Sequence, residues 1–406
     1  MDSPLDKLFR QISKSYPDTP FEVHFWDGSK ELYGSGHKKF VLKINKKEIV
    51  SRILAEGNLG FGEEYMKGNI EVEGDLQELM QFGNSEVYRS IRFPIREKAR
   101  LIRDFITMRC TVANAKKNIG RHYDISNDFY KLWLDDTLTY SCAYFENVSD
   151  TLKGAQLGKY EHICRKLRLK RGDKLVDIGC GWGGMMIYAA KNYGVKSVGC
   201  TLSEKQYEYA VNAVENEGLQ DKIKIHLKDY REIEGQFDKF VSIGMLEHVG
   251  KEFYPDFFAA AKRLLKPGGT GVLHHIGTIE DRPTDPWIVK YIFPGGWLPT
   301  LPIVLDMMNK HGFAYYDIED LRMHYAKTLD CWIANFENRI EAVRSLMLDN
   351  LGNQDKVREF VLMWRLYLNG SSAAFKYGTN RLYQIVFSNG LKNDLPLTRK
   401  YLYLPR

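Results

Sequence analysis

The feature that most constrains the fold of this chain is a regular alternation of short apolar runs and longer amphipathic segments after Arg121. The predicted strands are KLVDIGCG (174–181), SVGCTLS (197–203), KIKIHLKD (222–229), FDKFVSIGMLEHV (237–249) and GGTGVLHHIG (268–277). Helical segments separate them, one of them near 257–265. Such alternation is typical of a doubly wound α/β fold with a parallel sheet, in which ligands bind at the carboxyl ends of the strands.

The chain has 406 residues, which is more than one hydrophobic core usually organises, so we expect two domains. From Phe21 to about Met80 the pattern is mixed: FEVHFW and KFVLKIN predict strands, and KEIVSRILAEG predicts a helix that stops at Gly57. We therefore predict a small α+β domain over 1–90, a linker over 91–121 and a catalytic domain over 122–406.

One stretch of the catalytic domain departs from this organisation. Segment 283–302 (PTDPWIVKYIFPGGWLPTLP) interrupts the alternation and carries Trp287, Tyr291, Phe293 and Trp297, so an insertion near 283–330 is expected to cover an apolar ligand. Core packing is the alternative for at least half of these rings.

The basic charge of the chain is concentrated in one place. The net charge is +6, yet residues 91–121 hold nine Lys or Arg against two acids, a local charge of +7. Arg96, Arg100 and Arg103 share one face of a predicted amphipathic helix. Two interpretations stay open: a solvated linker helix, or a helix that binds anionic lipid headgroups. We expect no nucleic-acid partner, because the overall excess is modest.

The cysteines and the amino-terminus indicate a compartment. The six cysteines form no C-x-x-C pair, which predicts free thiols in a reducing environment and no metal site. No apolar signal segment and no run of 18 apolar residues occurs. We expect a cytoplasmic protein that does not span a membrane.

The strongest local motif is Leu175-Val-Asp-Ile-Gly-Cys-Gly-Trp-Gly-Gly184, a strand that ends beside an acid and runs into a glycine-rich turn before a helix. Glycines let the backbone approach a ligand at the helix N-terminus. The motif also satisfies G-x-G-x-x-G, which is typical of dinucleotide sites. Because the second strand ends in Cys200-Thr201 rather than in a ribose-binding acid, S-adenosylmethionine (SAM) is favoured over NAD.

A set of segments in a fixed order carries a family resemblance. They are HYDISNDFY (122–130), LTYSCAYF (138–145), VDIGCGWGG (176–184), GCTLSEKQ (199–206), GMLEHVG (244–250), LHHIG (273–277), YIFPGGWLP (291–299) and HYAKTLDCW (324–332). Together they resemble cyclopropane fatty acid synthases, and ILAEGNLGFGEEYMKG (53–68) is similar to the smaller first domain of that family. The resemblance implies a Rossmann-like SAM-dependent methyltransferase domain.

The resemblance also implies the residues that would bind SAM. Those near the amino-acid portion would include Ser141 and the glycine turn, those near the ribose Thr201 and Gln206, and those near the adenine Asp229 and Tyr230. The full implied set is Tyr123, Tyr140, Ser141, Asp177, Gly179, Gly181, Gly183, Thr201, Gln206, Asp229 and Tyr230.

The family's catalytic centre holds a bicarbonate ion, which the resemblance places among Cys142, Glu247, His274, Ile276 and Tyr325. A base suits the chemistry, because an alkene that takes up a methyl group becomes a carbocation and must lose a proton to close a ring. The backbones of Cys142 and Ile276 would donate to the ion, and Glu247 would accept from its protonated oxygen. His248 and His275 alternate away from these residues on an extended strand and are expected to be structural.

The resemblance therefore implies conversion of cis-unsaturated acyl chains of membrane phospholipids to cyclopropanes, with a phospholipid bilayer as partner and a homodimer as the assembly. Two alternatives stay open. A related SAM-dependent enzyme would quench the carbocation differently and give a methyl-branched chain. A lipid-binding adapter would keep the fold without catalysis.

Overall fold

The structure is a computed structural model that describes residues 4–84 and 126–403. These residues form two compact units. Unit 1 contains residues 4–84, 285–292 and 329–379, and unit 2 contains residues 126–284, 293–328 and 380–403. The expected catalytic range 122–406 thus contributes to both units. The predicted basic helix and Tyr123 lie outside the described residues.

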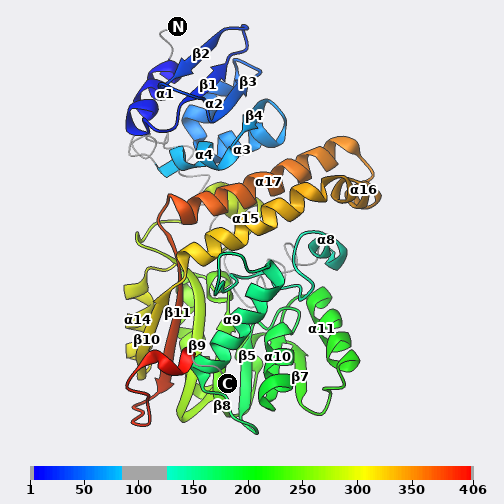
Figure 1. Cartoon of the computed structure of the whole chain (residues 1–406), viewed down its shortest axis with the longest axis vertical. Helices are drawn as coiled ribbons and strands as arrows, with labels where there is room; N and C mark the ends of the chain where they lie inside the picture. Colours follow the sequence, from blue (N-terminus) through cyan, green and yellow to red (C-terminus); the bar gives the residue numbers. More distant parts are fainter. Residues whose placement is uncertain (1–3, 85–125, 404–406) are drawn as a thin grey trace. The chain divides into compact units, whose positions relative to one another are not determined.

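Unit 1 contains a four-stranded sheet of order β2-β1-β3-β4, in which β1 pairs with β3 in parallel and the other pairs are antiparallel (Figure 1). Stacked rings of Phe21, Tyr33 and Phe40 fill its core. Its first elements are α1 (Pro4–Ser15), β1 (Phe21–His24), β2 (Lys30–Tyr33), β3 (Phe40–Ile44), α2 (Ile49–Glu56), α3 (Asn58–Met66), β4 (Ile70–Gly74), α4 (Leu76–Met80) and η1 (Gln81–Asn84). The two strands and the helix predicted here are confirmed: they are β1, β3 and α2, and Gly57 caps α2 with a φ of 57°.

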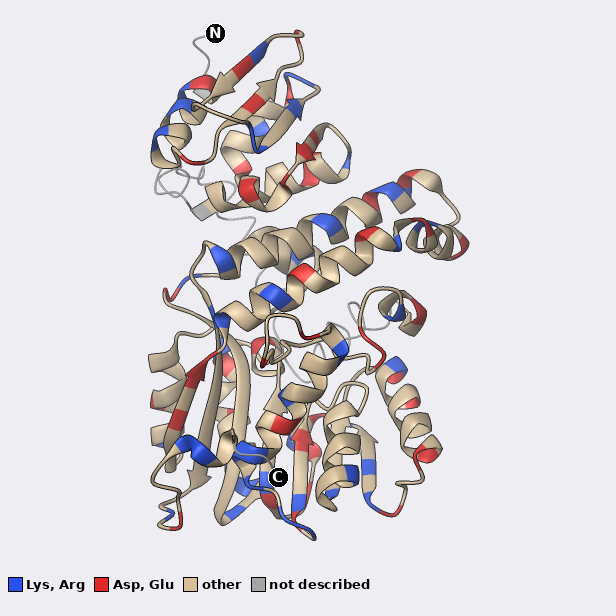
Figure 2. Ribbon diagram, in the orientation of Figure 1, with Lys and Arg blue, Asp and Glu red and all other residues tan. Residues whose placement is uncertain are grey.

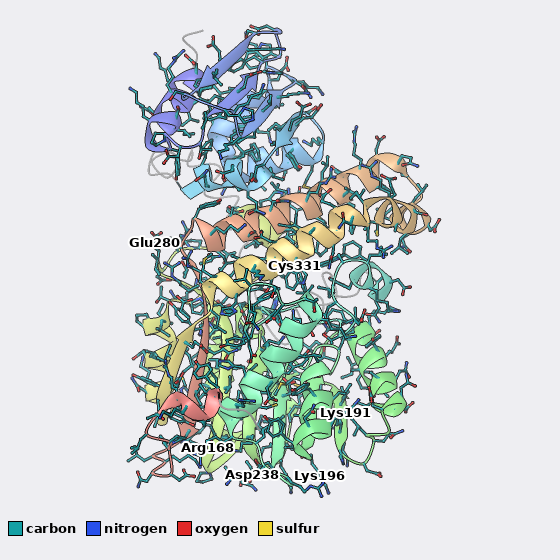
Figure 3. All side chains as sticks on the ribbon, viewed as in Figure 1. Arg168, Lys191, Lys196, Asp238, Glu280 and Cys331 are labelled. Carbon is teal, nitrogen blue, oxygen red and sulfur yellow. The ribbon has the colours of Figure 1, made fainter. Side chains whose placement is uncertain are left out.

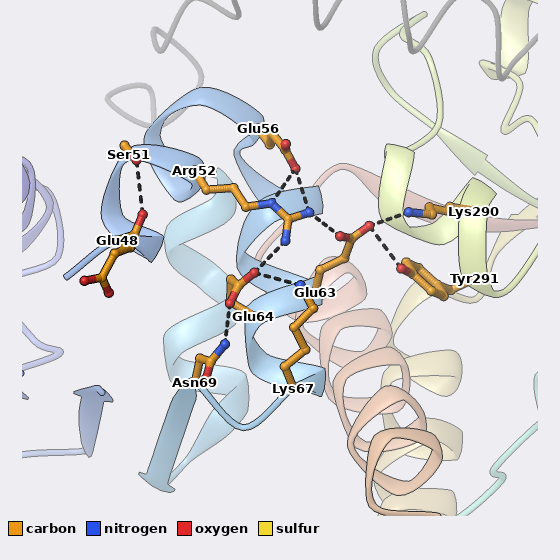
Figure 4. A network of polar contacts seen from close by, with 10 residues as sticks. All are labelled: Glu48, Ser51, Arg52, Glu56, Glu63, Glu64, Lys67, Asn69, Lys290 and Tyr291. Carbon is orange, nitrogen blue, oxygen red and sulfur yellow. Dashed lines mark hydrogen bonds and ion pairs between the residues drawn. The ribbon is translucent and has the colours of Figure 1, made fainter. Parts of the chain in front are cut away.

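Later parts of the chain complete unit 1. They are α13 (Pro286–Tyr291), the end of α15 (Arg322–Asn338), α16 (Ile340–Leu351) and α17 (Gln354–Lys376). Figure 4 shows how α13 is tied to α2 and α3: the Arg52 guanidinium binds Glu56, Glu63 and Glu64, and Glu63 also binds Lys290 and Tyr291. Although burial raises the pKa of Glu63, hydrogen bonds from Lys290 and Arg52 lower it to about 2. The network therefore keeps this carboxylate ionised.

Unit 2 is built on a seven-stranded sheet of order β10-β11-β9-β8-β5-β6-β7. Strands β5 to β9 are parallel, and β11 and β10 are antiparallel additions at one edge. The strands are β5 (Lys174–Ile178), β6 (Lys196–Thr201), β7 (Ile223–Leu227), β8 (Phe237–Ile243), β9 (Leu265–Thr278), β10 (Phe313–Asp320) and β11 (Asn380–Asn389). The predicted doubly wound α/β fold is confirmed.

Helices cover both faces of this sheet because successive side chains of a strand point to opposite faces. Leu175 of β5 packs with residues of α9 and α10, whereas Val176 packs with residues of α12 and α14. The helices of unit 2 are α8 (Asn127–Lys131), α9 (Leu152–Leu167), α10 (Gly184–Tyr193), α11 (Glu204–Asn216), α12 (Tyr254–Leu264) and α14 (Leu301–Lys310), with short 3₁₀ turns η2 (Tyr230–Glu232), η3 (Leu246–His248), η4 (Lys251–Phe253) and η5 (Arg399–Leu402).

Charged side chains lie at the amino ends of the parallel strands of unit 2. Lys and Arg gather there (Figure 2), among them Arg168 and Lys196, and the acid Asp238 lies at the same edge (Figure 3). Each strand then runs from this charged edge to its opposite, carboxyl end. No helix among residues 4–84 and 126–403 combines the length and the apolar composition that a bilayer crossing requires.

Candidate functional site

A cavity opens at the carboxyl ends of β5, β6 and β8, on the side where doubly wound folds bind ligands. It brings together nine of the eleven residues that the sequence implied for cofactor binding. They are Tyr140, Ser141, Asp177, Gly179, Gly181, Thr201, Gln206, Asp229 and Tyr230. Tyr123 lies outside the described residues. Gly183 is described, but it does not line the cavity.

The glycine turn forms one wall of the cavity. Gly179, Gly181 and Gly183 all have left-handed φ angles, of 83°, 55° and 84°. A Cβ at Gly179 would lie 2.7 Å from Met245 Cγ, whereas a Cβ at Gly181 would meet open space. Gly183 instead is the N-cap of α10. Two of the glycines thus shape the wall, and the third starts the helix.

Asp177 is the acid at the end of β5, and it is 2% exposed. Its Oδ1 atom has no hydrogen-bond partner among the described residues. Burial raises the pKa of Asp177 to about 7, although the nearby positive charge of Lys159 lowers it. A buried carboxyl without a partner fits a ligand that brings a hydrogen-bond donor, as the ammonium group of SAM would.

The residues that the resemblance implied for the ribose and the adenine are held by short-range contacts. The Thr201 hydroxyl donates to Gln206 Oε1 at 2.8 Å, and Ser203 caps α11, which holds both side chains beside the end of β6. Asp229 is committed to a bidentate ion pair with Arg231, at 2.7 and 2.8 Å. The positive charge of Arg231 thus balances the Asp229 carboxylate. Tyr230 lines this end of the cavity.

Lys159 is a cavity residue that the sequence analysis missed. It lies on α9, is 1% exposed, and its Nζ atom donates to Ser141 Oγ at 2.8 Å. Burial lowers its pKa to about 7, and Cys142, Asp135 and Asp177 oppose the shift. The available signal was its position between Ala155 and Ile163, on the buried face of the helix.

A second group of polar side chains lies next to the cavity. As expected, Glu247 follows β8 and His274 lies near the end of β9. Glu247 Oε1 accepts from the Ile276 N–H at 2.5 Å, and its other oxygen has no hydrogen-bond partner in the described part of the chain. Burial raises the pKa of Glu247 to about 7, against the lowering effect of the Ile276 N–H. The Ile276 amide, expected to serve an ion, is thus occupied by Glu247.

His274 completes this group. Its Nδ1 atom lies 3.0 Å from Gln384 Nε2, and its Nε2 atom is buried with no hydrogen-bond partner in residues 4–84 or 126–403. Burial holds the pKa of His274 well below its ordinary value, so the ring is neutral. A neutral imidazole with one open nitrogen is suited to donating or accepting a single hydrogen bond.

Cys142 and Tyr325 belong to segments that the structure ties together. The Ala143 N–H donates to Thr328 Oγ1, and the Phe145 N–H donates to His324 Nδ1, both at 3.0 Å. Both acceptors lie on α15, the helix that also carries Tyr325. The Cys142 thiol is fully buried and donates to the Ala143 carbonyl at 3.2 Å. Burial raises its pKa, so the side chain is a thiol and not a nucleophilic thiolate.

The expectation that both neighbouring histidines are structural is wrong for His248. His275 is buried, its Nδ1 contacts the Ile276 carbonyl at 2.9 Å, and its Nε2 has no hydrogen-bond partner among the described residues, so its structural role stays a prediction. His248 lines the cofactor cavity instead. The reason is that residues 246–248 form a 3₁₀ turn rather than an extended strand, so the alternation of side chains does not apply.

The four aromatic residues of the expected covering segment have different roles. Trp287 is buried against Gly62 in unit 1, and the Trp297 ring lies 5.4 Å from that of Tyr254 in the core of unit 2. The Phe293 ring lies 5.2 Å from that of His248, which lines the cavity. Core packing therefore accounts for both tryptophans, Tyr291 binds Glu63 in unit 1, and Phe293 contacts His248 of the cavity lining.

Comparisons with known proteins agree with this geometry. The family described as mycolic acid cyclopropane synthetase matches residues 111–385, and a domain of unknown function matches residues 8–90. A probable fatty acid methyltransferase of Pseudomonas putida is 35% identical over 95% of this chain and 96% of its own length. The cyclopropane-fatty-acyl-phospholipid synthase of Escherichia coli K12 is 36% identical over 88% of this chain and 90% of its own.

Solved structures extend the comparison. The mycolic acid cyclopropane synthase complexed with S-adenosylhomocysteine (SAH) and CTAB has a TM-score of 0.62 at 35% identity, over 67% of this chain and 98% of that one. A coclaurine N-methyltransferase bound to SAH has a TM-score of 0.68 at 18% identity, which shows the shared fold alone.

The sheet order, the glycine turn and these relatives define the class: the chain is a SAM-dependent methyltransferase. More particularly, it belongs to the mycolic acid cyclopropane synthetase family.

The glycine wall can be tested by substitution. We expect Gly181→Val to lower SAH affinity at least 10-fold in calorimetry, because the new side chain enters open space at the cavity wall. Gly172→Val is the matched control, since Gly172 has a φ of 90°, open space at its Cβ position and no place in the cavity lining. Equal affinity of the two folded variants would contradict the assignment.

The role of Lys159 can be tested with a ligand that lacks one group. We expect its ammonium to pair with the carboxylate of the cofactor, because Lys159 lines the cavity and forms no ion pair with a described residue. Lys159→Met should then weaken SAH binding by about 10- to 100-fold. The same variant should bind decarboxylated SAH as well as the wild type does. If both ligands lose affinity equally, Lys159 only supports Ser141.

Proposed function

We propose that this enzyme transfers a methylene group from SAM to the cis double bond of phospholipid acyl chains and so forms cyclopropane fatty acids. The observation that carries the proposal is the buried group beside the cofactor cavity, in which one oxygen of Glu247 and one nitrogen of His274 lack partners among the described residues. The name of the E. coli relative supports the phospholipid substrate.

The reaction requires a base next to an apolar chain. Bound SAM supplies an electrophilic methyl group. The alkene uses its π electrons to bond to that methyl carbon as the carbon–sulfur bond breaks, which leaves a carbocation on the acyl chain and SAH as the product. One proton of the transferred methyl must then leave, so that the C–H electrons close the ring.

We propose that a bicarbonate ion is this base. Glu247 would accept a hydrogen bond from its protonated oxygen, while His274 and the Tyr325 hydroxyl would donate to its other oxygens. Burial raises the pKa of Glu247 to about 7, so the ionised form that accepts this hydrogen bond is present near neutral pH. The Ile276 N–H acts through Glu247, whose Oε1 atom it holds.

A methyl-branched product is the second candidate, because the P. putida relative is called a probable fatty acid methyltransferase. Both products share the carbocation, and they differ in its fate. Mass analysis with labelled SAM distinguishes them: a gain of CH₂ without a remaining double bond indicates the ring. Incubation with unsaturated phospholipid vesicles that yields no transfer would favour the adapter alternative.

The base can be tested by two substitutions. We expect Glu247→Gln and His274→Gln to lower turnover by about 10²- to 10⁴-fold while SAH affinity changes little, because both act after the cofactor is bound. His275→Gln is the matched control on the same strand. Enzyme stripped of carbonate should be slow and should recover when bicarbonate is added. Full activity of the wild type in carbonate-free buffer would overturn the bicarbonate proposal.

We also propose that the enzyme works as a cytoplasmic homodimer on the inner membrane surface, through its basic stretch at 91–121. We expect Arg96→Gln, Arg100→Gln and Arg103→Gln together to reduce sedimentation with anionic vesicles, since each well-placed Lys or Arg contributes about 1 kcal/mol. Added salt should weaken the wild-type binding. If both proteins bind equally at all salt concentrations, the stretch is a linker and does not bind the membrane. The homodimer is tested separately, by sedimentation velocity.

A further inference from the structure

A line of hydrogen-bonded polar side chains runs from the partly exposed Glu319 of β10 through buried residues of α9 and β11 to His274. Glu319 Oε2 accepts from Lys166 Nζ at 2.5 Å, and the same Nζ donates to Gln384 Oε1 at 2.8 Å. Gln384 Nε2 then lies 3.0 Å from His274 Nδ1. The side chains of Lys166 and Gln384 are completely buried, and His274 is 1% exposed.

Lys166 determines which way the Gln384 amide points. An ammonium group has only hydrogens to offer, so it requires the oxygen of the amide. A flipped amide would bring its NH₂ group against the ammonium and leave the oxygen facing His274. The β11–β9 register places Gln384 directly opposite His274, so the amide group reaches the ring.

Lys166 in turn is held by Glu319, which keeps its negative charge. Although burial raises the pKa of Glu319, a hydrogen bond from His162 and the charge of Lys166 bring it down to about 2. Burial lowers the pKa of Lys166, and Glu319 opposes that shift by direct contact. The ion pair therefore stabilises the ammonium form that the Gln384 oxygen needs.

The direction of the hydrogen bonds then passes to the histidine. Because the Gln384 NH₂ group donates, His274 Nδ1 must accept, and in a neutral ring the proton then resides on Nε2. We infer that Gln384, oriented by Lys166 and Glu319, is a positioning residue that locks His274 in the Nε2–H tautomer, so that its open nitrogen is a hydrogen-bond donor toward an anion of the carboxylate or bicarbonate type.

This inference deepens the proposed function and rests on it for its catalytic consequence. In a His274 ring with its proton on Nε2, the lone pair of that nitrogen belongs to the aromatic system, so Nε2 cannot be the base that removes the methyl proton. It can only hold an anion that does so. The tautomer itself is a property of the folded protein and can be measured without substrate.

The first experiment reads the tautomer by nitrogen NMR. Full-length enzyme carrying ¹⁵N-histidine is compared with the His274→Gln variant, whose missing signals identify the ring, because protonated and unprotonated imidazole nitrogens have well-separated shifts. We expect a protonated Nε2 and an unprotonated Nδ1 in the wild type. A protonated Nδ1 would overturn the inference.

The second experiment reverses the relay. Gln384→Glu replaces the donor with a carboxylate oxygen, so it should move the His274 proton to Nδ1. Lys166→Met should release the amide and give a mixture of the two tautomers. Lys239→Met is the matched control, because Lys239 is another largely buried lysine of unit 2, and its Nζ atom donates to the Leu167 carbonyl away from this line. An unchanged tautomer in Gln384→Glu would contradict the inference.

The kinetic arm separates this inference from the proposed function. In Gln384→Glu the bicarbonate concentration for half-maximal rate should rise about 10- to 100-fold, as expected when one hydrogen bond to a charged group is lost. Unchanged SAH affinity in calorimetry would show that the variant is folded. If the tautomer moves as expected but bicarbonate has no effect on any variant, the relay stands and the bicarbonate proposal fails.

Discussion

The parallel pairing of β5 with β6 on one side and with β8 on the other is the constraint on which the catalytic unit depends. The connections that follow these strands go to opposite sides of β5. A space therefore opens between their loops at the carboxyl ends of the strands. The glycine turn after β5 and the Glu247 turn after β8 therefore border the same space. Residues far apart in the sequence become neighbours because their strands end at one edge.

Burial of polar groups at that edge has an energetic cost, and the structure shows where it falls. Asp177, Glu247 and Lys159 all have pKa values moved to about 7, in each case toward the uncharged form because water is excluded. Such groups gain most from a ligand that supplies the missing charge or hydrogen bond. We therefore interpret the cavity as arranged for its ligands rather than for the stability of the empty protein.

The contrast between Glu247 and Glu319 shows how the partners of a carboxylate decide its state. Both side chains are withdrawn from water, but Glu319 contacts Lys166 and His162, whereas Glu247 receives one backbone N–H. The first carboxylate stays ionised and anchors a line of hydrogen bonds. The second carboxyl group has a pKa of about 7 and is partly protonated near neutral pH, which suits a site shared with an anion. Unit 2 thus uses one glutamate for structure and another for the proposed chemistry.

The sequence by itself determined the doubly wound fold and the glycine turn, because these depend on local patterns of strand, turn and helix, and most of the cofactor wall was implied by the family resemblance. It also placed Glu247 and His274 at the ends of the correct strands. Only the tertiary structure decided the roles of Lys159, His248 and Gln384. Lys159 needs Ser141, Gln384 needs a lysine 218 positions away, and His248 depends on a 3₁₀ turn that interrupts the strand pattern. The physical reason is that the chemistry of a buried polar side chain is set by its partners in space, which local periodicity does not encode.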